Sequence, residues 1–564
     1  MNPIFSYTYL FPAIALPTLL VLAYTYKAFN LRPENVFHIT STDILAGLFF
    51  LYVTLNIYLK SFTAPKISDY YTVIICALLY VILRVYYQNK LLVSRVITFL
   101  TLIGFSEAVI AGTQLMQGQI LLGSFGNRAV FANVLAAIFP FMAYSLVVAR
   151  QNKRPLYEVG FFAASSGLTY YLIAFHSYSR TAFIATSLVG LLLVLQATGV
   201  FSTKLSKRKL TILISSLVVG FTLLVAGALF IKADSTSGRW FILQREFELI
   251  LHQPFFGIGF KNFDKCYNDH QSTYFANHTN PDAELLSAYV NVNYNEYMDL
   301  LLKGGLFGGL LFILLLANLT KRIRSNRKSS LMFILSLAGL FVLGLFSYPG
   351  ETMIIVFIFL FSVTGMISAE KTHSFVFRAN EKVVFIALSI VSLVVSGGLI
   401  YRYNAVMRWH LIASSKPAQA LNAEAIKRLY TSVMPELSDD PLVLKDFARN
   451  LYLTKDYPGA ISLLNQATAY SSHYDLYVLL GECYEKLNSL SEAESAYLKS
   501  SLLVPKLFYP RYRLMMLYTN QQDDAQALKL ANKIIEMPIK IDSKLVREIK
   551  ARAWALKTQL PKEK

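Results

Sequence analysis

The stretch 330–347 reads SLMFILSLAGLFVLGLFS and contains no charged residue. A bilayer core about 30 Å thick is crossed by roughly 20 apolar residues in a helix, so this stretch predicts a transmembrane helix. Over the whole chain of 564 residues, 55% are hydrophobic and 15% are charged, and the mean hydropathy is +0.45. Such a composition excludes an ordinary soluble globular protein and indicates an integral membrane protein.

Similar apolar stretches recur along residues 1–402 and predict about twelve membrane helices. Helices are expected because strand edges would leave backbone groups unpaired in lipid. The predicted spans are 9–26, 43–59, 70–87, 92–112, 129–149, 158–176, 181–200, 210–231, 297–317, 330–347, 351–368 and 383–401.

Lysines and arginines gather in alternate connections between these spans, most densely at 204–209 and 321–328. Basic connections tend to stay cytoplasmic, which predicts that the long polar loop 232–296 lies outside. By parity, the tail 403–564 and the N-terminus are also expected outside, and the first span is expected to stay as an anchor. Much of the formal net charge of +19 is then a topology signal, and no nucleic-acid partner is expected.

No metal or nucleotide cofactor is expected from the sequence. The three cysteines, Cys76, Cys266 and Cys483, lie far apart, without CxxC or zinc-ligand spacing. Neither a Walker A motif nor GxGxxG is present, so ATP-driven chemistry has no support.

The tail after about residue 403 is amphipathic and repeats. One stretch has residues at the positions that a 34-residue tetratricopeptide repeat (TPR) requires: Tyr477, Leu480, Gly481, Tyr484, Ala493, Tyr497 and Pro505. Weaker copies flank it, with a leading helix at 418–434 and a capping helix at 543–557. A soluble α-helical TPR solenoid is predicted over 403–564. It either braces the membrane part or recruits an acceptor on its concave face.

Three arginines on the predicted outer side are candidates for binding a diphosphate: Arg128, Arg180 and Arg239. A guanidinium group stays protonated and offers a planar fork to two phosphate oxygens at once. The competing interpretation is that each arginine reaches lipid headgroups or pairs with a nearby acid.

The motifs around these arginines resemble those of the O-antigen ligase and polymerase superfamily, the Wzy_C-type membrane glycosyltransferases. They are Gly123-x-Phe-Gly-Asn127 with Phe131-Ala132, Ser179-Arg180-Thr-Ala182, Gly238-Arg239-Trp240, Pro254-Phe-Phe-Gly257-Ile-Gly259, and Asn295-Glu-Tyr-x-x-x-Leu-x-x-Gly304-Gly305-x-x-Gly308. Together they cover approximately residues 90–320. Their order and spacing carry the resemblance.

The resemblance implies an all-α, GT-C-like membrane domain over 1–402 that works at the periplasmic face of the bacterial inner membrane. It implies transfer of a glycan from an undecaprenyl-diphosphate carrier to a hydroxyl on lipid, on protein or on a growing polysaccharide. Arg180 and Arg239 match the family arginines thought to hold the diphosphate, with Arg128 as a further candidate.

The sequence departs from the family at Tyr294, where a histidine is frequent. Glu296 is the preferred general base, because a carboxylate at the mouth of a span is costly unless it is used. Its alternative role is to complement a helix dipole. Tyr294 and Asn295 are expected to face the acceptor. The remaining candidate bases are His278, Glu284 and His270.

Two further patterns predict structure. Apolar residues at roughly helical spacing from Trp240 to Leu251 predict a helix along the membrane interface, in reach of the lipid carrier. The glycines at 257, 259, 304, 305, 308 and 309 predict close packing or turns. Ser347-Tyr-Pro-Gly350 predicts a tight turn.

The favoured function is that of an O-antigen ligase or protein O-oligosaccharyltransferase, because a recognition domain beside the active loop suits a macromolecular acceptor. The expected partners are an undecaprenyl-diphosphate-linked glycan and an acceptor protein or lipid. A Wzy-type polysaccharide polymerase is the nearest alternative. A non-enzymatic lipid or polysaccharide transporter, or a membrane scaffold, is the alternative from another class.

Overall fold

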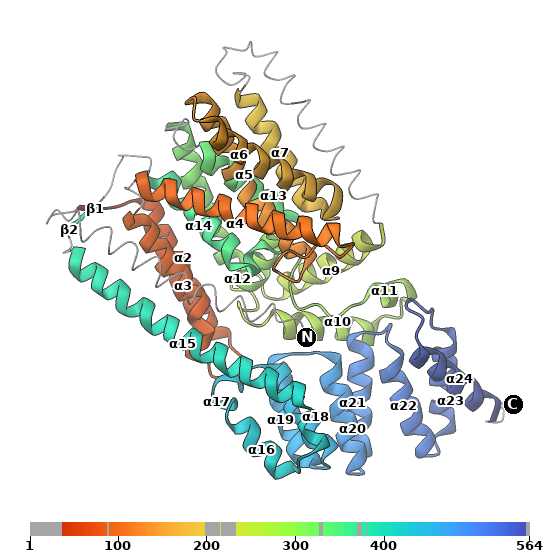
Figure 1. The fold of residues 1–564 in the computed structure, drawn as a ribbon. Coiled ribbons are helices and arrows are strands. Elements are labelled where there is room, and N and C mark those ends of the chain that lie inside the picture. The colour runs from red at the N-terminus through yellow and green to blue at the C-terminus, as the bar shows by residue number, and fades with distance from the viewer. Residues whose placement is uncertain are drawn as a thin grey trace. The chain divides into compact units, whose positions relative to one another are not determined.

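The computed structural model describes residues 36–86, 90–197, 215, 233–325, 331–368, 375–378 and 381–559. The predicted spans at 9–26 and 210–231 lie outside these residues, as does the basic segment 204–209. Within the described part the chain is helical, apart from a short antiparallel ladder between β1 (Val36–Ile39) and β2 (Phe375–Arg378) (Figure 1). The predicted all-α fold class is confirmed.

Helices occupy every predicted span within the described residues. They are α2 (Ser41–Lys60), α3 (Tyr71–Tyr86), α4 (Lys90–Met116), α5 (Arg128–Gln151), α6 (Leu156–Tyr171) with the π-helical turn Leu172–His176, α7 (Arg180–Ala197), α12 (Glu296–Ser325), α13 (Leu331–Phe346), α14 (Met353–Ser368) and α15 (Glu381–Ser415).

Several of these helices suit a bilayer. Among the described residues, 5 helices are long and apolar enough to cross a membrane: Ser41–Lys60, Val93–Met116, Arg128–Gln151, Glu296–Lys321 and Ile386–Gln419. Shorter apolar helices are Arg180–Gln196, Leu331–Phe346 and Met353–Ile367. The protein is therefore a polytopic membrane protein.

The chain divides into two compact units. The membrane unit comprises Met1–Leu59, Lys66–Thr236 and Asn293–Tyr403. The repeat unit comprises Lys60–Pro65, Ser237–Val292 and Asn404–Lys564. Most of the long polar loop therefore groups with the C-terminal helices.

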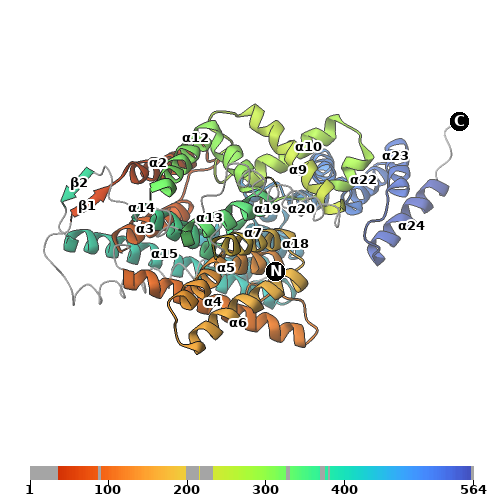
Figure 2. The same cartoon turned by 90° about the horizontal axis from the view of Figure 1, so that it is seen from above.

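Helix α5 is central to the membrane unit. It contacts α4, α6, α7, α13 and α14, and Figure 2 shows α4 to α7 gathered together. The run from Phe131 to Ala143 is buried throughout. Gly104 of α4 allows a close approach, since a Cβ there would lie 2.9 Å from Ile138. Small residues of this kind let membrane helices pack closely.

Helix α12 is interrupted at its cluster of glycines. Gly305 has φ 62° and ψ −168°, a backbone region open almost only to glycine. The carbonyl before it, on Gly304, accepts a hydrogen bond from the Tyr52 hydroxyl. A Cβ on Gly309 would lie 2.7 Å from Leu301. The prediction of packing and turn glycines is confirmed here.

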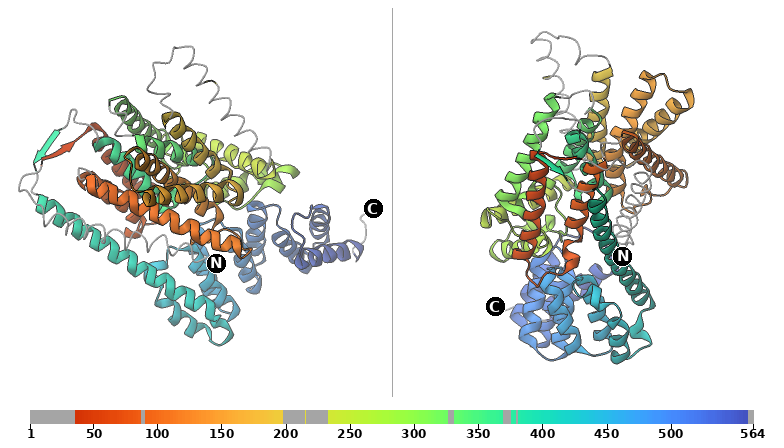
Figure 3. Two further views of the ribbon diagram at one scale, coloured as in Figure 1. Left: turned by 45° about the horizontal axis from the view of Figure 1, so that its top comes forward. Right: turned by 90° about the vertical axis from the view of Figure 1, so that its left-hand side faces the viewer.

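The C-terminal part of the repeat unit is a series of antiparallel helix pairs, seen in Figures 1 and 3 as blue ribbons that follow one another in chain order. The pairs are α18 (Pro441–Leu453) with α19 (Tyr457–Tyr470), α20 (Tyr474–Lys486) with α21 (Leu490–Leu503), and α22 (Phe508–Asn520) with α23 (Asp524–Glu536). Before them lie α16 (Ala423–Thr431) and α17 (Met434–Leu437), and α24 (Lys544–Gln559) follows. The leading helix is shorter than predicted because Asn422 caps it, its side chain accepting from the Ala425 N–H.

The repeat motif has a direct steric cause. A Cβ on Gly481 would lie 2.6 Å from the ring of Tyr497, which is fully buried in the partner helix. The turn inside each pair uses one residue with positive φ at the same place: Lys455, Asn488 and Gln522. The helical-repeat solenoid predicted from the sequence is confirmed.

Candidate functional site

Arg128 and Arg180 begin two neighbouring membrane helices, α5 and α7. Asn127 caps α5, because its side chain accepts hydrogen bonds from the N–H groups of Ala129 and Val130 at 2.9 and 3.3 Å. Ser179 accepts from the Ala182 N–H at 3.3 Å at the start of α7. Free N–H groups and the helix dipole make such N-termini favourable for an anion.

Two polar side chains of α4, the buried Glu107 and the half-buried Gln114, hold the turn before α5. Glu107, only 7% exposed, accepts from the Ser124 N–H at 2.9 Å. Gln114 accepts from the Gly123 N–H and donates to the Gly123 carbonyl, at 2.9 and 3.0 Å. Gly123 has φ +55°, and a Cβ there would lie 2.6 Å from Glu107. These contacts fix the position of the backbone that leads into α5, and so the position of Arg128 at its first turn.

A tyrosine that sequence reasoning missed links the two arginine helices. Tyr178 has φ 53° and is 69% exposed, and its ring lies 5.0 Å from the guanidinium carbon of Arg128. The Arg128 Nε atom is buried and forms no hydrogen bond within the described residues. The pattern Ser-Tyr-Ser-Arg before α7 was the available signal for this contact.

Glu296 lies at the first turn of α12 and is held by the turn between α13 and α14. Its Oε1 accepts a hydrogen bond from the Gly350 N–H at 2.7 Å. A Cβ on Gly350 would lie 2.9 and 3.0 Å from the two carboxylate oxygens. The predicted turn is present as the 3-10 turn Pro349–Glu351. Asn133 of α5 donates to the Ser347 hydroxyl at 2.8 Å, tying α5 to the same turn.

Asn295 and Tyr294 precede Glu296 and have structural contacts of their own. Asn295 caps α12, because its Oδ1 accepts from the Tyr297 and Met298 N–H groups, both at 3.0 Å. Its amide nitrogen donates to the Leu345 carbonyl at 3.0 Å. The ring of Tyr294 meets Tyr348 edge to face at 5.7 Å.

An ion pair inside α12 was not anticipated. Lys303 contacts Asp299 at 2.7 Å, with side-chain exposures of 14% and 18%. Glu296 and Glu351 are within electrostatic range of the same lysine. Charged groups inside membrane spans are rare and often functional. The i, i+4 spacing of an acid and a lysine within an apolar run was the available signal.

The other site candidates lie in the repeat unit. Arg239 is half-buried on α9 (Ala233–His252). His278 is exposed at the end of α10 (Phe263–Asn277), stacked on Tyr274 at 4.7 Å. His270 faces Glu248, with 3.1 Å between Nε2 and Oε2. Because Arg239 and His278 belong to a different compact unit from Arg180 and Glu296, their joint action remains a prediction.

Glu284 is engaged by two cations of the repeats. It lies in α11 (Pro281–Leu286) and contacts Arg511 at 3.2 Å and Lys533 at 3.0 Å. Burial lowers the pKa of the Arg511 guanidinium, while the carboxylate of Glu284 acts in the opposite direction. These contacts favour a structural role for Glu284 rather than that of a general base.

Helix α10 packs on the second helices of two repeats, α19 and α21. Lys499 of α21 contacts Asp269 at 2.7 Å and donates to the Ser272 hydroxyl at 2.7 Å. Gln271 donates to the Leu503 carbonyl at 2.7 Å. The pKa of Asp269 is lowered, since the nearby ammonium of Lys499 outweighs burial. The loop helices and the repeats therefore form one packed body.

A second contact joins the loop to the turn before α20. The Tyr289 hydroxyl donates to Asp264 at 2.5 Å, and its ring lies 4.2 Å from that of His473. Burial raises the pKa of Asp264, against the hydrogen bonds that it accepts. Burial also lowers the pKa of His473 to about 4.

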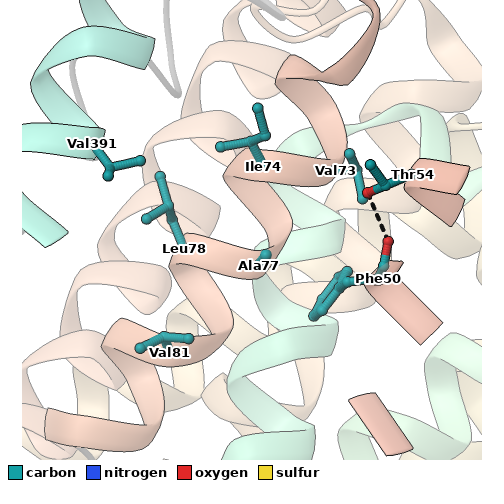
Figure 4. A pocket seen from close by; sticks show the side chains of 8 residues that line it. All are labelled: Phe50, Thr54, Val73, Ile74, Ala77, Leu78, Val81 and Val391. Carbon is teal, nitrogen blue, oxygen red and sulfur yellow. Dashed lines mark hydrogen bonds between the residues drawn. The ribbon is translucent and has the colours of Figure 1, made fainter. Parts of the chain in front are cut away.

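The pocket in Figure 4 is separate from these residues. It lies between α2, α3 and α15 and is lined by Phe50, Thr54, Val73, Ile74, Ala77, Leu78, Val81 and Val391. The hydroxyl of Thr54 donates to the Phe50 carbonyl at 2.8 Å. The lining offers no charge for a phosphate. In the ranges that the structure describes, no group of three or more His, Cys, Asp or Glu side chains is placed to hold a metal ion.

Fold and site together define a polytopic helical membrane protein with a helical-repeat tail and arginines at the ends of its membrane helices. Residues 161–313 match the family model described as O-Antigen ligase, Wzy_C. The match contains Arg180, Arg239 and Glu296, whereas Arg128 precedes it. These residues thus form a domain of the O-antigen ligase type, and such a domain suggests glycan transfer in polysaccharide biosynthesis.

Other comparisons add little. No curated protein matches the chain. Among solved structures it is similar to one titled "Crystal Structure of the Yeast Tom70", with a TM-score of 0.24 and 14% sequence identity, over 76% of this chain and 89% of that chain. A likeness of this size adds nothing to the repeat architecture seen directly in α18 to α23.

Proposed function

We propose that this protein transfers a glycan from an undecaprenyl-diphosphate carrier to an acceptor hydroxyl, as an O-antigen ligase or protein O-oligosaccharyltransferase. The reaction takes place at the outer face of the inner membrane, where the loop 232–296 and the repeats lie. The observation that carries the proposal is the pair of arginines, Arg128 and Arg180, at the capped N-termini of adjacent helices beside and within the ligase domain.

The diphosphate is the leaving group, and its charge must be stabilised as the bond to the anomeric carbon breaks. Arg180 and Arg128 supply guanidinium groups next to helix N-termini, and Arg239 supplies a third from the loop. Preorganised donors of this kind are often the largest contribution to catalysis. The acceptor oxygen forms the new bond to the anomeric carbon as its proton passes to a base.

Glu296 is the proposed base. Its Oε1 is oriented by the Gly350 N–H, and Asn295 fixes the start of the helix that bears it. Asp299 and Lys303, about one and two turns further along α12, form an ion pair on the same helix. Tyr294 is proposed to orient the acceptor, and His278 is the alternative base.

The acceptor is proposed to be macromolecular. This rests on the packing of α10 and α11 against the repeats, which joins a recognition domain to the loop that carries Arg239. The same packing supports placing loop and tail on one side of the membrane. A polymerase, whose acceptor is another lipid-linked glycan, has no comparable need for such a body.

Proteoliposomes with purified protein, lipid-linked donor and acceptor test the proposal. Arg180→Ala and Arg239→Ala should each lower transfer by about 10²- to 10³-fold, as for loss of one oxyanion donor. Arg428→Ala is the matched control, because that side chain is 81% exposed on α16. Undiminished transfer in both site variants contradicts the diphosphate site.

A deletion strain separates the two subtypes. Full-length glycan left on the lipid, together with unmodified acceptor, is expected for a ligase. Accumulation of single repeat units on the lipid identifies a polymerase instead.

A further inference from the structure

Helix α9 of the repeat unit has one buried face, which packs against α10. Phe241, Ile242 and Leu249 on that face are 5%, 9% and 8% exposed. Phe241 stacks on Phe275 of α10 with 5.9 Å between ring centroids. The guanidinium carbon of Arg245 lies 3.9 Å from the ring centre of Tyr274. This face fixes α9 to α10.

The opposite face of α9 carries large apolar side chains that are exposed. Trp240, Phe247 and Leu251 are 62%, 56% and 63% exposed. At 3.6 residues per turn they fall within about 40° of the helix circumference. Phe255 and Phe256, in the turn directly after the helix, are also exposed, at 65% and 53%. These five residues are called the aromatic stripe below.

The stripe brings together five large exposed apolar side chains on one helix and the turn that follows it. Single exposed apolar residues are common, whereas contiguous apolar patches indicate a partner or a membrane. The sequence pattern alone counted Phe241 with Trp240 and Phe247, but the structure separates them onto different faces. What remains exposed is a narrow row dominated by aromatic rings.

The connection to the membrane limits what can cover the stripe. The predicted span 210–231 ends nine residues before Trp240, a distance of about 13 Å along a helix. An interfacial helix buries its apolar face about 5–10 Å into the boundary of headgroups and acyl chains. Trp, in particular, is enriched at that depth. The bilayer that this predicted span crosses is therefore within reach of the stripe.

We propose that the aromatic stripe lies in the lipid interface of the membrane that holds the spans, with the bilayer itself as its occupant. Arg239, next to Trp240, is then held at the depth of the lipid phosphates. Because α9 is fixed to α10, and α10 to α21 through Lys499 and Asp269, the stripe also holds the repeats at the membrane surface. The inference is independent of glycan transfer.

The three tryptophans of the chain provide the test, since all lie in the repeat unit and differ in exposure. Trp240 is 62% exposed on the stripe, Trp554 is 52% exposed on α24, and Trp409 is 5% exposed. Three variants, each keeping one tryptophan and replacing the other two by Phe, are reconstituted in vesicles of ordinary or acyl-brominated phosphatidylglycerol and phosphatidylethanolamine. No donor is added.

Brominated lipid is expected to remove most of the emission of Trp240, while aqueous acrylamide has little effect on it. The emission of Trp554 should be quenched by acrylamide and little affected by brominated lipid. The emission of Trp409 should be quenched by neither. Replacing Phe247 and Leu251 by Gln in the Trp240 variant should weaken lipid quenching, with Trp409 emission in the parallel variant reporting an intact repeat unit.

Three results overturn the proposal. The first is a Trp240 quenched by acrylamide and not by brominated lipid. The second is shielding of Trp240 only after undecaprenyl diphosphate is added, which identifies the carrier tail as the occupant. The third is shielding that rises with protein density in the vesicles, which identifies a second copy of the chain.

Discussion

Glu284→Gln tests whether the loop is held by the repeats or supplies a catalytic acid there. The side chains of Glu284 and Arg511 are 18% and 7% exposed, so the pair is largely buried. Removing one partner leaves Arg511 buried beside Met537, whose sulfur lies 3.5 Å from Nη1. The neutral amide can still accept a hydrogen bond but no longer compensates the charge.

The expected cost follows from that burial. Breaking a buried ion pair by removing one partner costs about 3–5 kcal/mol, and the remaining amide places this case near 3 kcal/mol. Since 1.4 kcal/mol is a factor of ten, opening of α11 should rise about 100-fold. Lys533→Met removes the partner that is 43% exposed, and should cost no more than about 1 kcal/mol.

Hydrogen exchange of the peptide containing α11, in nanodiscs, measures this opening. Exchange should be fast in Glu284→Gln, near normal in Lys533→Met, and largely restored in the double variant Glu284→Leu/Arg511→Met, because an apolar pair leaves no buried charge. Glycan transfer should be low where exchange is fast, and near normal where exchange is near normal.

The opposite pattern would refute the structural role. If Glu284→Gln loses transfer with unchanged exchange, and the apolar double variant does not recover it, Glu284 acts on the substrate. It would then return as a candidate base.

Three other predictions follow from single contacts. Gly350→Ala should lower glycan transfer as much as Glu296→Gln, because the new Cβ would lie 2.9 Å from the Glu296 carboxylate. Gly190→Ala is the control and should leave transfer unchanged, because a Cβ there would meet open space. Neutral His473 stabilises the repeat unit fully above pH 6.5, and this stabilisation should be lost as the pH falls toward the folded pKa of His473, about 4. In His473→Gln, the melting temperature of the repeat unit should not show this part of the decrease at low pH. Gly481→Ala should lower the unfolding free energy by about 1–3 kcal/mol through overpacking, and an unchanged melting temperature would refute the packing argument.

Much of the fold was predictable because its signals are local. Twenty apolar residues in lipid have few options besides a helix, so spans such as 330–347 needed no tertiary information. The repeat was readable for a similar reason, since Gly481 must be small wherever Tyr497 packs against it.

The candidate site was only partly predictable. Arg180 and Glu296 stood out because charge at a membrane boundary is costly. The partners that orient them come from distant segments: Gly350 reaches Glu296 across 54 positions, and Asn133 reaches Ser347 across 214. No spacing rule connects such residues.

By itself, the sequence determined the all-helical membrane class and the helical-repeat tail, because each depends on local composition or a short period. It also singled out three arginines as candidates for binding a diphosphate, because charge is conspicuous at the ends of apolar spans. Only the tertiary structure decided that Glu284 is bound by Arg511 and that α10 packs on α21. It also decided that Phe241 is buried while Trp240 is exposed. These outcomes depend on which surfaces meet, and a linear pattern does not contain that information.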